Sequence, residues 1–207
     1  MTEKFRNGKP FLVVEGGSGV GKTTAVKGIA SHLPNWRFLR EPGGTPFGDL
    51  MRDAVQGRKD LEIDPVAAFM AYSASRANIV NLEIMPVLTG TTEHEGVLLD
   101  RYWFSTYAYQ GSEKVDKAII VSISKLVTGG LMPDLVLHFD LLPELAERRK
   151  SKREDQDRYD VKPKDFHARV RDAYLELSVM YPEIWKVIDA SKSPEEVLSD
   201  ALAAMRE

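Results

Sequence analysis

The chain has 207 residues, 43% of them hydrophobic, and a formal net charge of −3 at pH 7. This length and hydrophobic content allow one sizeable core, so we expect a single domain over residues 1–207. The sequence contains no cysteine, which excludes disulfides, thiolate zinc sites and cysteine nucleophiles. The slight acidic excess argues against nucleic acid as a general partner, because a protein that binds the phosphate backbone usually has a basic excess.

Membrane and metal-centre functions also find no support in the sequence. No apolar stretch approaches the length of a membrane span, and residues 1–10 lack the hydrophobic region of a signal peptide. We therefore expect a cytoplasmic protein without a membrane partner. The four histidines lie far apart without metal-ligand spacing, which is typical of surface or packing residues: His32, His94, His138 and His167.

The first predicted element is a buried parallel strand at residues 11–15, a continuous apolar run that ends at glycines. Residues 16–23 then have the form GxxxxGKT, and a helix is predicted from Lys22 to about His32. Such a loop aims backbone N–H groups and the positive end of the helix dipole at one point, which favours phosphate. A glycine-rich turn that merely joins a strand to a helix is the alternative.

We favour a nucleotide triphosphate site, because the strand and the helix stand where such a site requires them. Lys22 would reach the β and γ phosphates, and the Thr23 hydroxyl can ligate Mg²⁺. The predicted ATP-binding residues are Gly16, Gly17, Ser18, Gly19, Val20, Gly21, Lys22, Thr23 and Thr24.

A second short strand is predicted at residues 36–39, followed by a loop at residues 40–45 that is rich in Gly and Pro. In open parallel sheets, ligands bind at this carboxyl edge of the strands. Thr45 is predicted to cap the next helix, with Arg52 pointing back toward the loop. That helix is predicted to carry four apolar residues inward: Leu50, Met51, Ala54 and Val55.

Asp64 and Pro65 predict the start of the longest helix, which continues toward Leu88. A buried strand at residues 97–99 follows and ends at Asp100. A carboxylate at the tip of an apolar strand suits the Mg²⁺ shell of a nucleotide site. The alternative is that Asp100 caps the following helix.

We expect a further helix to start at Ser112 and to bury an apolar stripe before Gly129 and Gly130 end it. A fourth strand is predicted at residues 135–139, and Pro143 opens a helix that runs into the basic residues 148–153. Five cations within six residues repel one another, so an anion would order this helix end. We expect a short basic lid over the phosphates, roughly at residues 148–160, although a solvated helical tip explains the charges equally well by itself.

The last predicted elements are an apolar-striped helix at residues 166–181, a strand at residues 185–188 and a helix opened by a capping box at residues 193–196. Five strands separated by helices, with a phosphate-binding loop after the first, predict an α/β fold. Its architecture is that of a P-loop NTPase, a five-stranded parallel sheet with helices on both faces.

Several ordered motifs together resemble the thymidylate kinase family. They are EGGSGVGKTT at residues 15–24, REPGGT at 40–45, YSASRAN at 72–78, DRYWFSTYAYQG at 100–111 and RRKSKREDQDRYD at 148–160. The resemblance implies transfer of the γ-phosphoryl group of ATP to dTMP, giving dTDP and ADP in dTTP biosynthesis, with Mg²⁺. It also implies a homodimer, for which the apolar residues at 66–87 could supply a face.

The resemblance implies roles for single residues in binding dTMP. Arg101 and Arg52 would hold the phosphate, with Arg40 supporting that loop. Tyr72 would stack on thymine and Arg76 would bind the base oxygen, whereas the plainer alternative makes Tyr72 a core residue and Arg76 a surface charge. The remaining implied contacts are Thr106 at the base edge, Tyr109 under the sugar, where it would exclude a 2′-hydroxyl, and Gln110 beside it.

Ser18 departs from the family pattern, which usually has Asp or Glu at this position of the loop. The role of that carboxylate is therefore absent, or passes to Glu15, Asp100 or water. The loop also lacks an arginine, so the chain resembles the branch in which lid arginines reach the phosphates, with Arg149 and Arg153 as candidates and Arg158 as a weaker one.

Phosphoryl transfer needs two phosphates in line and relief of charge on the moving group. We expect Lys22, Arg101, Arg149 and Arg153 to neutralise the transition state, with Mg²⁺ on Thr23 and Asp100. The alternatives are another nucleotide or nucleoside kinase of this fold, a regulatory P-loop protein, or a catalytically silent binding module.

Overall fold

The structure is a computed structural model that describes residues 8–58, 60–150 and 158–206. Its centre is one five-stranded sheet in the order β2-β3-β1-β4-β5, and every neighbouring pair is parallel. This confirms the predicted sheet. The strands are β1 (Phe11–Gly16), β2 (Arg37–Arg40), β3 (Val97–Asp100), β4 (Leu135–Asp140) and β5 (Trp185–Asp189).

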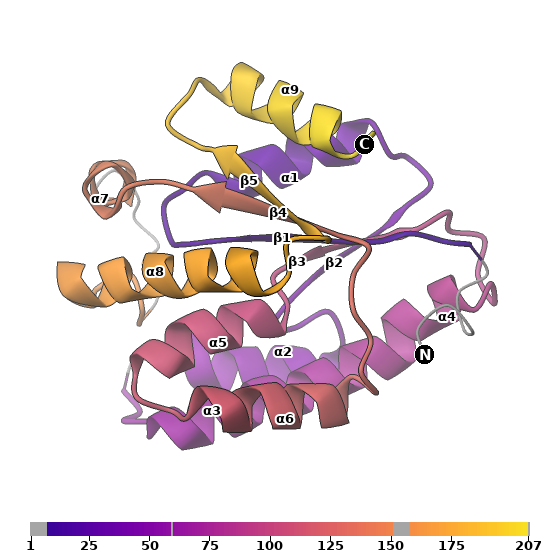
Figure 1. Cartoon of the computed structure of the whole chain (residues 1–207). Helices are drawn as coiled ribbons and strands as arrows, with labels where there is room; N and C mark the ends of the chain where they lie inside the picture. Colours follow the sequence, from indigo (N-terminus) through magenta and orange to yellow (C-terminus); the bar gives the residue numbers. More distant parts are fainter. Residues whose placement is uncertain (1–7, 59, 151–157, 207) are drawn as a thin grey trace.

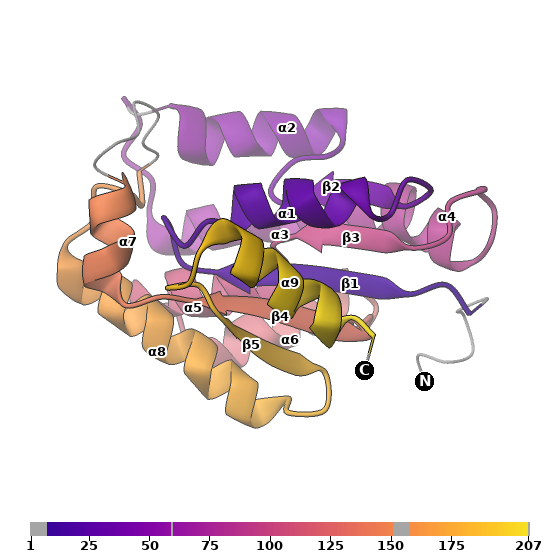
Figure 2. The same ribbon diagram turned by 90° about the horizontal axis from the view of Figure 1, so that it is seen from above.

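Helices cover both faces of this sheet, as predicted (Figures 1 and 2). Helices α1 and α9 lie on one face, and α5 and α8 pack on the other, with α2, α3 and α6 beyond them. Among the described residues, no helix is long and apolar enough to cross a membrane. The helices are α1 (Lys22–Ser31), α2 (Pro46–Arg52), α3 (Pro65–Ile79), α4 (Met85–Leu88), α5 (Trp103–Ser112), α6 (Lys117–Val127), α7 (Pro143–Lys150), α8 (Lys164–Met180) and α9 (Pro194–Ala204), with π-helical turns η2 (Asp53–Gly57) and η3 (Val80–Ile84).

Strand β1 is buried from both sides because successive side chains alternate between two cores. Phe11 and Val13 enter the core beneath α5 and α8, whereas Leu12 and Val14 enter the core beneath α1 and α9. The strand order reverses at β1, so β3 and β4 flank it on opposite sides. The carboxyl end of a strand at such a switch point is where an open α/β sheet has room for a ligand.

The structure corrects the predicted helix start at Ser112, which is instead the last residue of α5. That helix was not predicted, since its sequence was interpreted only as a motif. The following helix, α6, begins at Lys117, because the Asp116 side chain accepts from the N–H groups of Ala118 and Ile119. Lys114 separates the two helices in a left-handed conformation, with φ 72°.

Two predictions for the second helix have opposite outcomes. The expectation that Leu50 points inward is wrong, since its side chain is 66% exposed, whereas Val55 is buried as predicted. The π-helical turn η2 directly follows α2, and its wider turn shifts the helical periodicity on which the prediction relied. Thr45 caps α2 by accepting from the Gly48 N–H, and Arg52 points back to the loop, where its Nη1 donates to the Pro42 carbonyl oxygen at 2.6 Å.

Candidate active site

The glycine-rich loop joins the carboxyl end of β1 to the first turn of α1, as predicted. A Cβ at Gly16 would lie 2.5 Å from the carbonyl oxygen of Phe139, so no larger residue fits there without a shift of backbone. Gly21 is the N-cap of α1 and adopts φ 96°, a conformation that favours glycine. Since glycine has no side chain to accept from the first helical N–H groups, those donors remain available to an anion.

Lys22 lies inside this loop. Its Nζ donates to the carbonyl oxygens of Gly16 and Gly17, both at 2.8 Å, and the residue is 7% exposed. Burial lowers the pKa of Lys22 to about 7; the cation of Arg101 lowers it further, and the nearby carboxylates oppose the shift. A phosphate bound in the loop would therefore restore a full positive charge on Lys22.

Asp100 and Thr23 are the predicted metal ligands. Asp100 Oδ2 lies 3.8 Å from Arg40 Nε, and its buried Oδ1 has no hydrogen-bond partner among the described residues. Thr23 is exposed in the first turn of α1. The described residues contain no group of three or more His, Cys, Asp or Glu that could hold a metal ion. This donor set fits Mg²⁺ that arrives with phosphates, since that ion is commonly held by one or two protein oxygens, phosphates and water.

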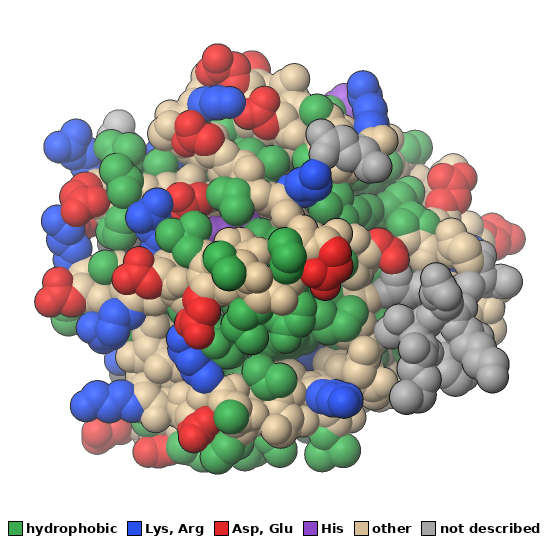
Figure 3. Space-filling model, viewed as in Figure 1, with side chains coloured by type: hydrophobic (Ala, Val, Ile, Leu, Met, Phe, Trp, Pro, Cys, Tyr) green, Lys and Arg blue, Asp and Glu red, His purple; other side chains and the backbone are tan. Residues whose placement is uncertain are grey.

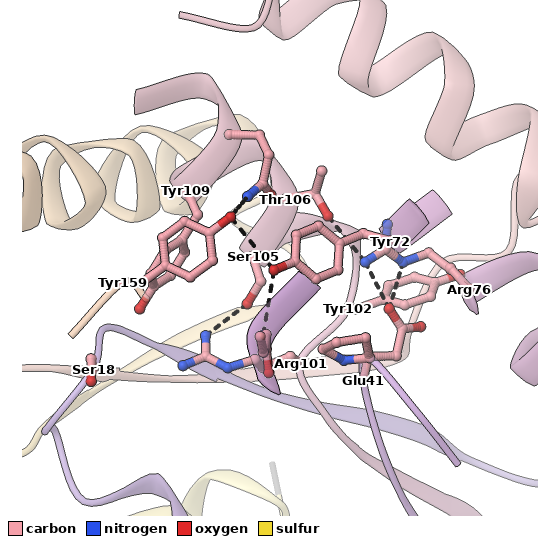
Figure 4. Close-up of a pocket in the computed structure, with 13 residues that line it drawn as sticks. Ser18, Glu41, Tyr72, Arg76, Arg101, Tyr102, Ser105, Thr106, Tyr109 and Tyr159 are labelled. Atoms are coloured by element: carbon pink, nitrogen blue, oxygen red, sulfur yellow. Dashed lines mark hydrogen bonds and ion pairs between the residues drawn. The ribbon is translucent and has the colours of Figure 1, made fainter. Parts of the chain in front are cut away.

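A pocket of about 490 Å³, part of which is open to solvent, lies beside the loop (Figure 4). Six of the eight predicted dTMP-binding residues line it, whereas Arg40 and Arg52 lie outside its lining. The lining residues are Ser18, Glu41, Pro42, Gln56, Tyr72, Arg76, Arg101, Tyr102, Ser105, Thr106, Tyr109, Gln110 and Tyr159. We call this cavity the acceptor pocket.

One end of the acceptor pocket is organised by a buried ion pair. Arg76 Nε lies 2.7 Å from Glu41 Oε2, and its Nη2 donates to Thr106 Oγ1 at 3.1 Å. The side chains of Arg76 and Glu41 are 3% and 2% exposed, which excludes the interpretation of Arg76 as a surface charge. Burial raises the pKa of Glu41 to about 7, and Arg76 opposes the shift. The pair places a guanidinium and a hydroxyl where they can bind the polar edge of a base.

Tyrosines form the wall of the acceptor pocket. The hydroxyl of Tyr159 accepts from Gln110 Nε2 at 2.7 Å and lies 3.5 Å from the Tyr72 hydroxyl. The rings of Tyr109 and Tyr159 meet edge to face, with centroids 5.3 Å apart. We did not predict Tyr159 or Gln56 as site residues; the RYD triplet at the end of the fifth motif was the available signal for Tyr159.

Arg101 lies where the acceptor pocket meets the glycine-rich loop. Its Nη1 donates to the Gly16 carbonyl oxygen at 3.1 Å and to Ser105 Oγ at 2.9 Å. Its guanidinium lies 5.3 Å from the centre of the Tyr109 ring, and its backbone has φ 73°. A non-glycine residue in that conformation is strained, which is common where the surrounding structure fixes a side chain for function.

The three candidate lid arginines differ in where the structure places them. Arg149 Nη1 donates to the Ala190 carbonyl oxygen at 2.9 Å and to that of Val20 at 3.5 Å, so this side chain lies against the glycine-rich loop. Arg158 Nη2 instead donates to the Ile63 carbonyl oxygen at 3.2 Å. Arg153, and with it part of the predicted lid at residues 148–160, lies outside the described residues.

The structure gives Ser18 a partner that the sequence did not suggest. Its hydroxyl donates to the carboxylate of Asp160, directly after Tyr159 in the acceptor-pocket wall. A carboxylate thus lies beside the loop although the loop has none at this position. Asp160 joins Glu15 and Asp100 as a residue that could take over the missing acidic role.

The fold, the phosphate-binding loop and the adjoining acceptor pocket define a P-loop kinase of small phosphorylated acceptors. A family model described as thymidylate kinase matches residues 14–201. Thymidylate kinases of Thermosynechococcus vestitus and Deinococcus radiodurans are 39% and 37% identical to this chain, cover 94% and 95% of it, and are themselves covered to 87% and 96%. The chain belongs to the thymidylate kinase family.

A solved structure supports the fold. The crystal structure of thymidylate kinase from Ehrlichia chaffeensis matches with a TM-score of 0.77 and 24% identity, over 95% of this chain and 98% of that one. Together with the parallel sheet, this confirms the predicted P-loop NTPase architecture.

Proposed function

We propose that this protein is a thymidylate kinase that transfers the γ-phosphoryl group of ATP to dTMP, giving dTDP and ADP. Membership of the family supports the reaction. The observation that carries it is the adjacency of two sites with complementary chemistry. Both Ser18 and Arg101 line the acceptor pocket. Ser18 belongs to the glycine-rich loop, and Arg101 donates to the Gly16 carbonyl oxygen of that loop. A phosphate of ATP in the loop and the phosphate of dTMP in the pocket would therefore lie next to each other.

In the donor site, ATP phosphates would bind the backbone of residues 16–24 and the ammonium of Lys22. Arg149, which lies against Val20 and Ala190, would add a cation to this site. Thr23 and Asp100 would hold Mg²⁺, which neutralises charge on the phosphates when it is bound. Arg153 remains a proposed member of this cation set.

In the acceptor site, Arg101 would bind the dTMP phosphate, with Arg52 and Arg40 supporting the neighbouring loop. Arg76 and Thr106 would bind the thymine edge, and Tyr72 would stack on the ring. Tyr109 and Gln110 would contact the sugar. A phosphate oxygen of dTMP is already anionic, so no general base is needed; the side chains align the two phosphates and offset the charge of the moving group.

We also propose that the protein is a homodimer, formed through helices α2, α3 and α6. Helices α2 and α6 each pack against α3, and all three carry exposed apolar side chains. Hydrophobic residues lie along the lower edge of the molecule in Figure 3, where α3 and α6 lie. Val66 and Met70 share one face of α3 by their spacing, and Ile119 and Leu126 share one face of α6. The exposed fractions of these four side chains are 49%, 44%, 53% and 74%.

The decisive experiment is a coupled assay of ADP formation from ATP and Mg²⁺, with dTMP compared against other nucleoside monophosphates and against nucleosides. We expect dTMP to give the highest kcat/KM. A higher value with another acceptor would make the protein a different kinase of this fold, and nucleotide binding without ADP formation would make it a binding module.

A further inference from the structure

A fully buried carboxylate lies directly beneath Arg101. Glu15, in strand β1, is 0% exposed and accepts four hydrogen bonds. Its Oε1 accepts from the N–H groups of Tyr102 and Ser105, at 2.8 and 3.2 Å, and its Oε2 accepts from Ser105 Oγ at 2.6 Å and Tyr174 Oη at 2.9 Å. Glu15 thus ties together the start of α5 and the middle of α8.

The same two hydroxyls also face Arg101. Arg101 Nη1 lies 2.9 Å from Ser105 Oγ and 3.4 Å from Tyr174 Oη, in addition to its contact with Gly16. Within the described residues, Nη1 makes all the hydrogen bonds of this guanidinium, which leaves the donors on Nε and Nη2 for another partner. A guanidinium held at one nitrogen presents its other edge as a fork that matches a phosphate.

Counting hydrogens shows why the carboxylate matters. Each hydroxyl has one hydrogen to donate and lone pairs with which to accept. Ser105 donates to Glu15 Oε2, and Tyr174 donates either to Glu15 Oε2 or to Ser105 Oγ, which lies 2.8 Å away. In both arrangements each hydroxyl keeps a lone pair that can accept from Arg101 Nη1. As the buried acceptor that contacts both hydroxyls, Glu15 Oε2 therefore orders them in the sense that Arg101 requires. Burial raises the pKa of this carboxyl, and the positive charge of Arg101 and the hydrogen bonds from Ser105, Tyr102 and Tyr174 oppose the shift.

Tyr174 is itself held in place from the opposite side. Its ring stacks on the buried His138 of β4, with centroids 5.0 Å apart and an interplanar angle of 29°. The Tyr174 residue is 0% exposed, so its hydroxyl cannot turn away to water. Helix α8 thereby presents one hydroxyl, in a fixed position, to the side chain at the junction of the two sites.

We propose that Glu15 and Tyr174 are positioning residues, which orient Arg101 so that its Nε and Nη2 edge faces the phosphates. This inference rests on the proposed function of Arg101 in phosphate binding. Neither Glu15 nor Tyr174 lines the acceptor pocket, so their proposed effect on the acceptor phosphate is exerted through Arg101. Removing either contact leaves the guanidinium in place but free to rotate.

The first test is Tyr174→Phe, which removes the hydroxyl and keeps the ring stacked on His138. Loss of one orienting hydrogen bond in the transition state should lower kcat/KM for dTMP about tenfold, while KM for ATP stays within about twofold. The matched control is Tyr107→Phe. Tyr107 also joins α5 to α8, through a 2.8 Å hydrogen bond to Glu176, but lies outside the acceptor-pocket lining. Equal activity losses in the two variants would mean a structural role only and would overturn the proposal.

The second test is a double-mutant cycle with Arg101→Lys. If Tyr174 acts through the guanidinium, Tyr174→Phe should cost about tenfold in the native background and less than about twofold in the Arg101→Lys background. Equal costs in both backgrounds would contradict the inference. Should Tyr174→Phe fail to fold, Glu15→Gln carries the same expectation for kcat/KM with dTMP in the two backgrounds, and its KM for ATP is not used because Glu15 also acts on the charge of Lys22. Arg101→Ala separates the two proposals, because near-normal turnover of that variant would refute the proposed role of Arg101 itself.

Discussion

Lys22 and Arg101 donate to the same atom, the carbonyl oxygen of Gly16. Lys22 Nζ lies 2.8 Å and Arg101 Nη1 lies 3.1 Å from that oxygen. Lys22 belongs to the donor loop and Arg101 lines the acceptor pocket, so two cations from two sites meet at one backbone atom. Their mutual repulsion is relieved when an anion binds between them, which favours phosphates at the place where transfer would occur.

Lys22→Ala should abolish most of the activity with little loss of stability. Removing the ammonium takes away charge stabilisation of the transition state, and we expect kcat to fall at least about a hundredfold. The melting temperature should change by only a few degrees, since the hydrogen bonds of this lysine to described residues go to backbone oxygens of its own loop. Lys27→Ala, an exposed lysine on the same helix, is the control. A Lys22→Ala enzyme of near-normal rate would rule out the proposed mechanism.

ATP binding should be coupled to proton uptake by Lys22. With a pKa of about 7 in the nucleotide-free protein, this lysine is mostly neutral at pH 8. Bound phosphates favour its charged form, so binding should take up a proton, and ATP affinity should fall as the pH rises above 7. Calorimetry in buffers of different ionisation enthalpy measures the uptake. The Lys22→Arg variant has an arginine that is always charged, so it should take up fewer protons on binding ATP than the native protein. Identical proton uptake by the two proteins would assign the proton to another group.

Tyr109→Phe should weaken discrimination between dTMP and its ribonucleotide counterpart TMP. Tyr109 lines the acceptor pocket and lies under the Arg101 guanidinium, where its hydroxyl would occupy the space of a 2′-hydroxyl. Removing one oxygen should reduce the ratio of kcat/KM values about tenfold or more. The ratio is measured with both acceptors at saturating ATP. An unchanged ratio would show that another residue excludes the ribose.

The sequence predicted the sheet because its local signals were strong. Apolar runs bounded by glycine or by a strand-end carboxylate marked β1 and β3, and the GxxxxGKT loop fixed where the site lies. It did not predict α5, because that segment is rich in aromatic residues, and its helical face became apparent only from the strand β1 and helix α8 packed against it.

The contacts that organise Arg101 were beyond sequence analysis for a different reason. Glu15, Ser105 and Tyr174 meet across separations of 90 and 69 residues, and no spacing rule relates positions so far apart. In the sequence, Tyr174 is part of an apolar helical stripe, and Glu15 is the last residue of a buried run and one candidate for the missing acidic role of the loop. Only the fold shows that the Tyr174 hydroxyl and the Glu15 carboxylate lie within hydrogen-bond distance of each other and of Ser105.

His138 should make the protein sensitive to acid. Burial lowers its pKa to about 4, so between pH 6.5 and 4 the unfolded chain binds the proton that the folded protein excludes. The free energy of unfolding therefore decreases as the pH is lowered through this window, and His138 accounts for a loss of about 3 kcal/mol at pH 4. His138→Phe keeps a ring against Tyr174, and urea unfolding should show a smaller loss of stability from pH 7 to pH 4. Parallel profiles for both proteins would contradict the assignment.

The proposed dimer predicts that a charge on α6 will separate the protomers. Leu126 is 74% exposed, so replacing it by Asp removes no contact within the core of one chain. If α6 lies in the interface, Leu126→Asp buries an unpaired charge there, which should weaken association at least about a hundredfold. Light scattering over a dilution series should give twice the chain mass for the native protein and the chain mass for the variant.

A matched control comes from helix α8, on which Val179 is 80% exposed. Val179→Asp introduces the same charge at an apolar position outside α2, α3 and α6, so this variant should remain a dimer. A native protein that is monomeric at every concentration would refute the dimer. A dimer that dissociates in the Val179→Asp variant but not in the Leu126→Asp variant would show that the interface lies on another face of the protein. Because the acceptor pocket is lined by residues of α3 and α5, the activity of dissociated Leu126→Asp would then tell whether association supports the α3 side of that pocket.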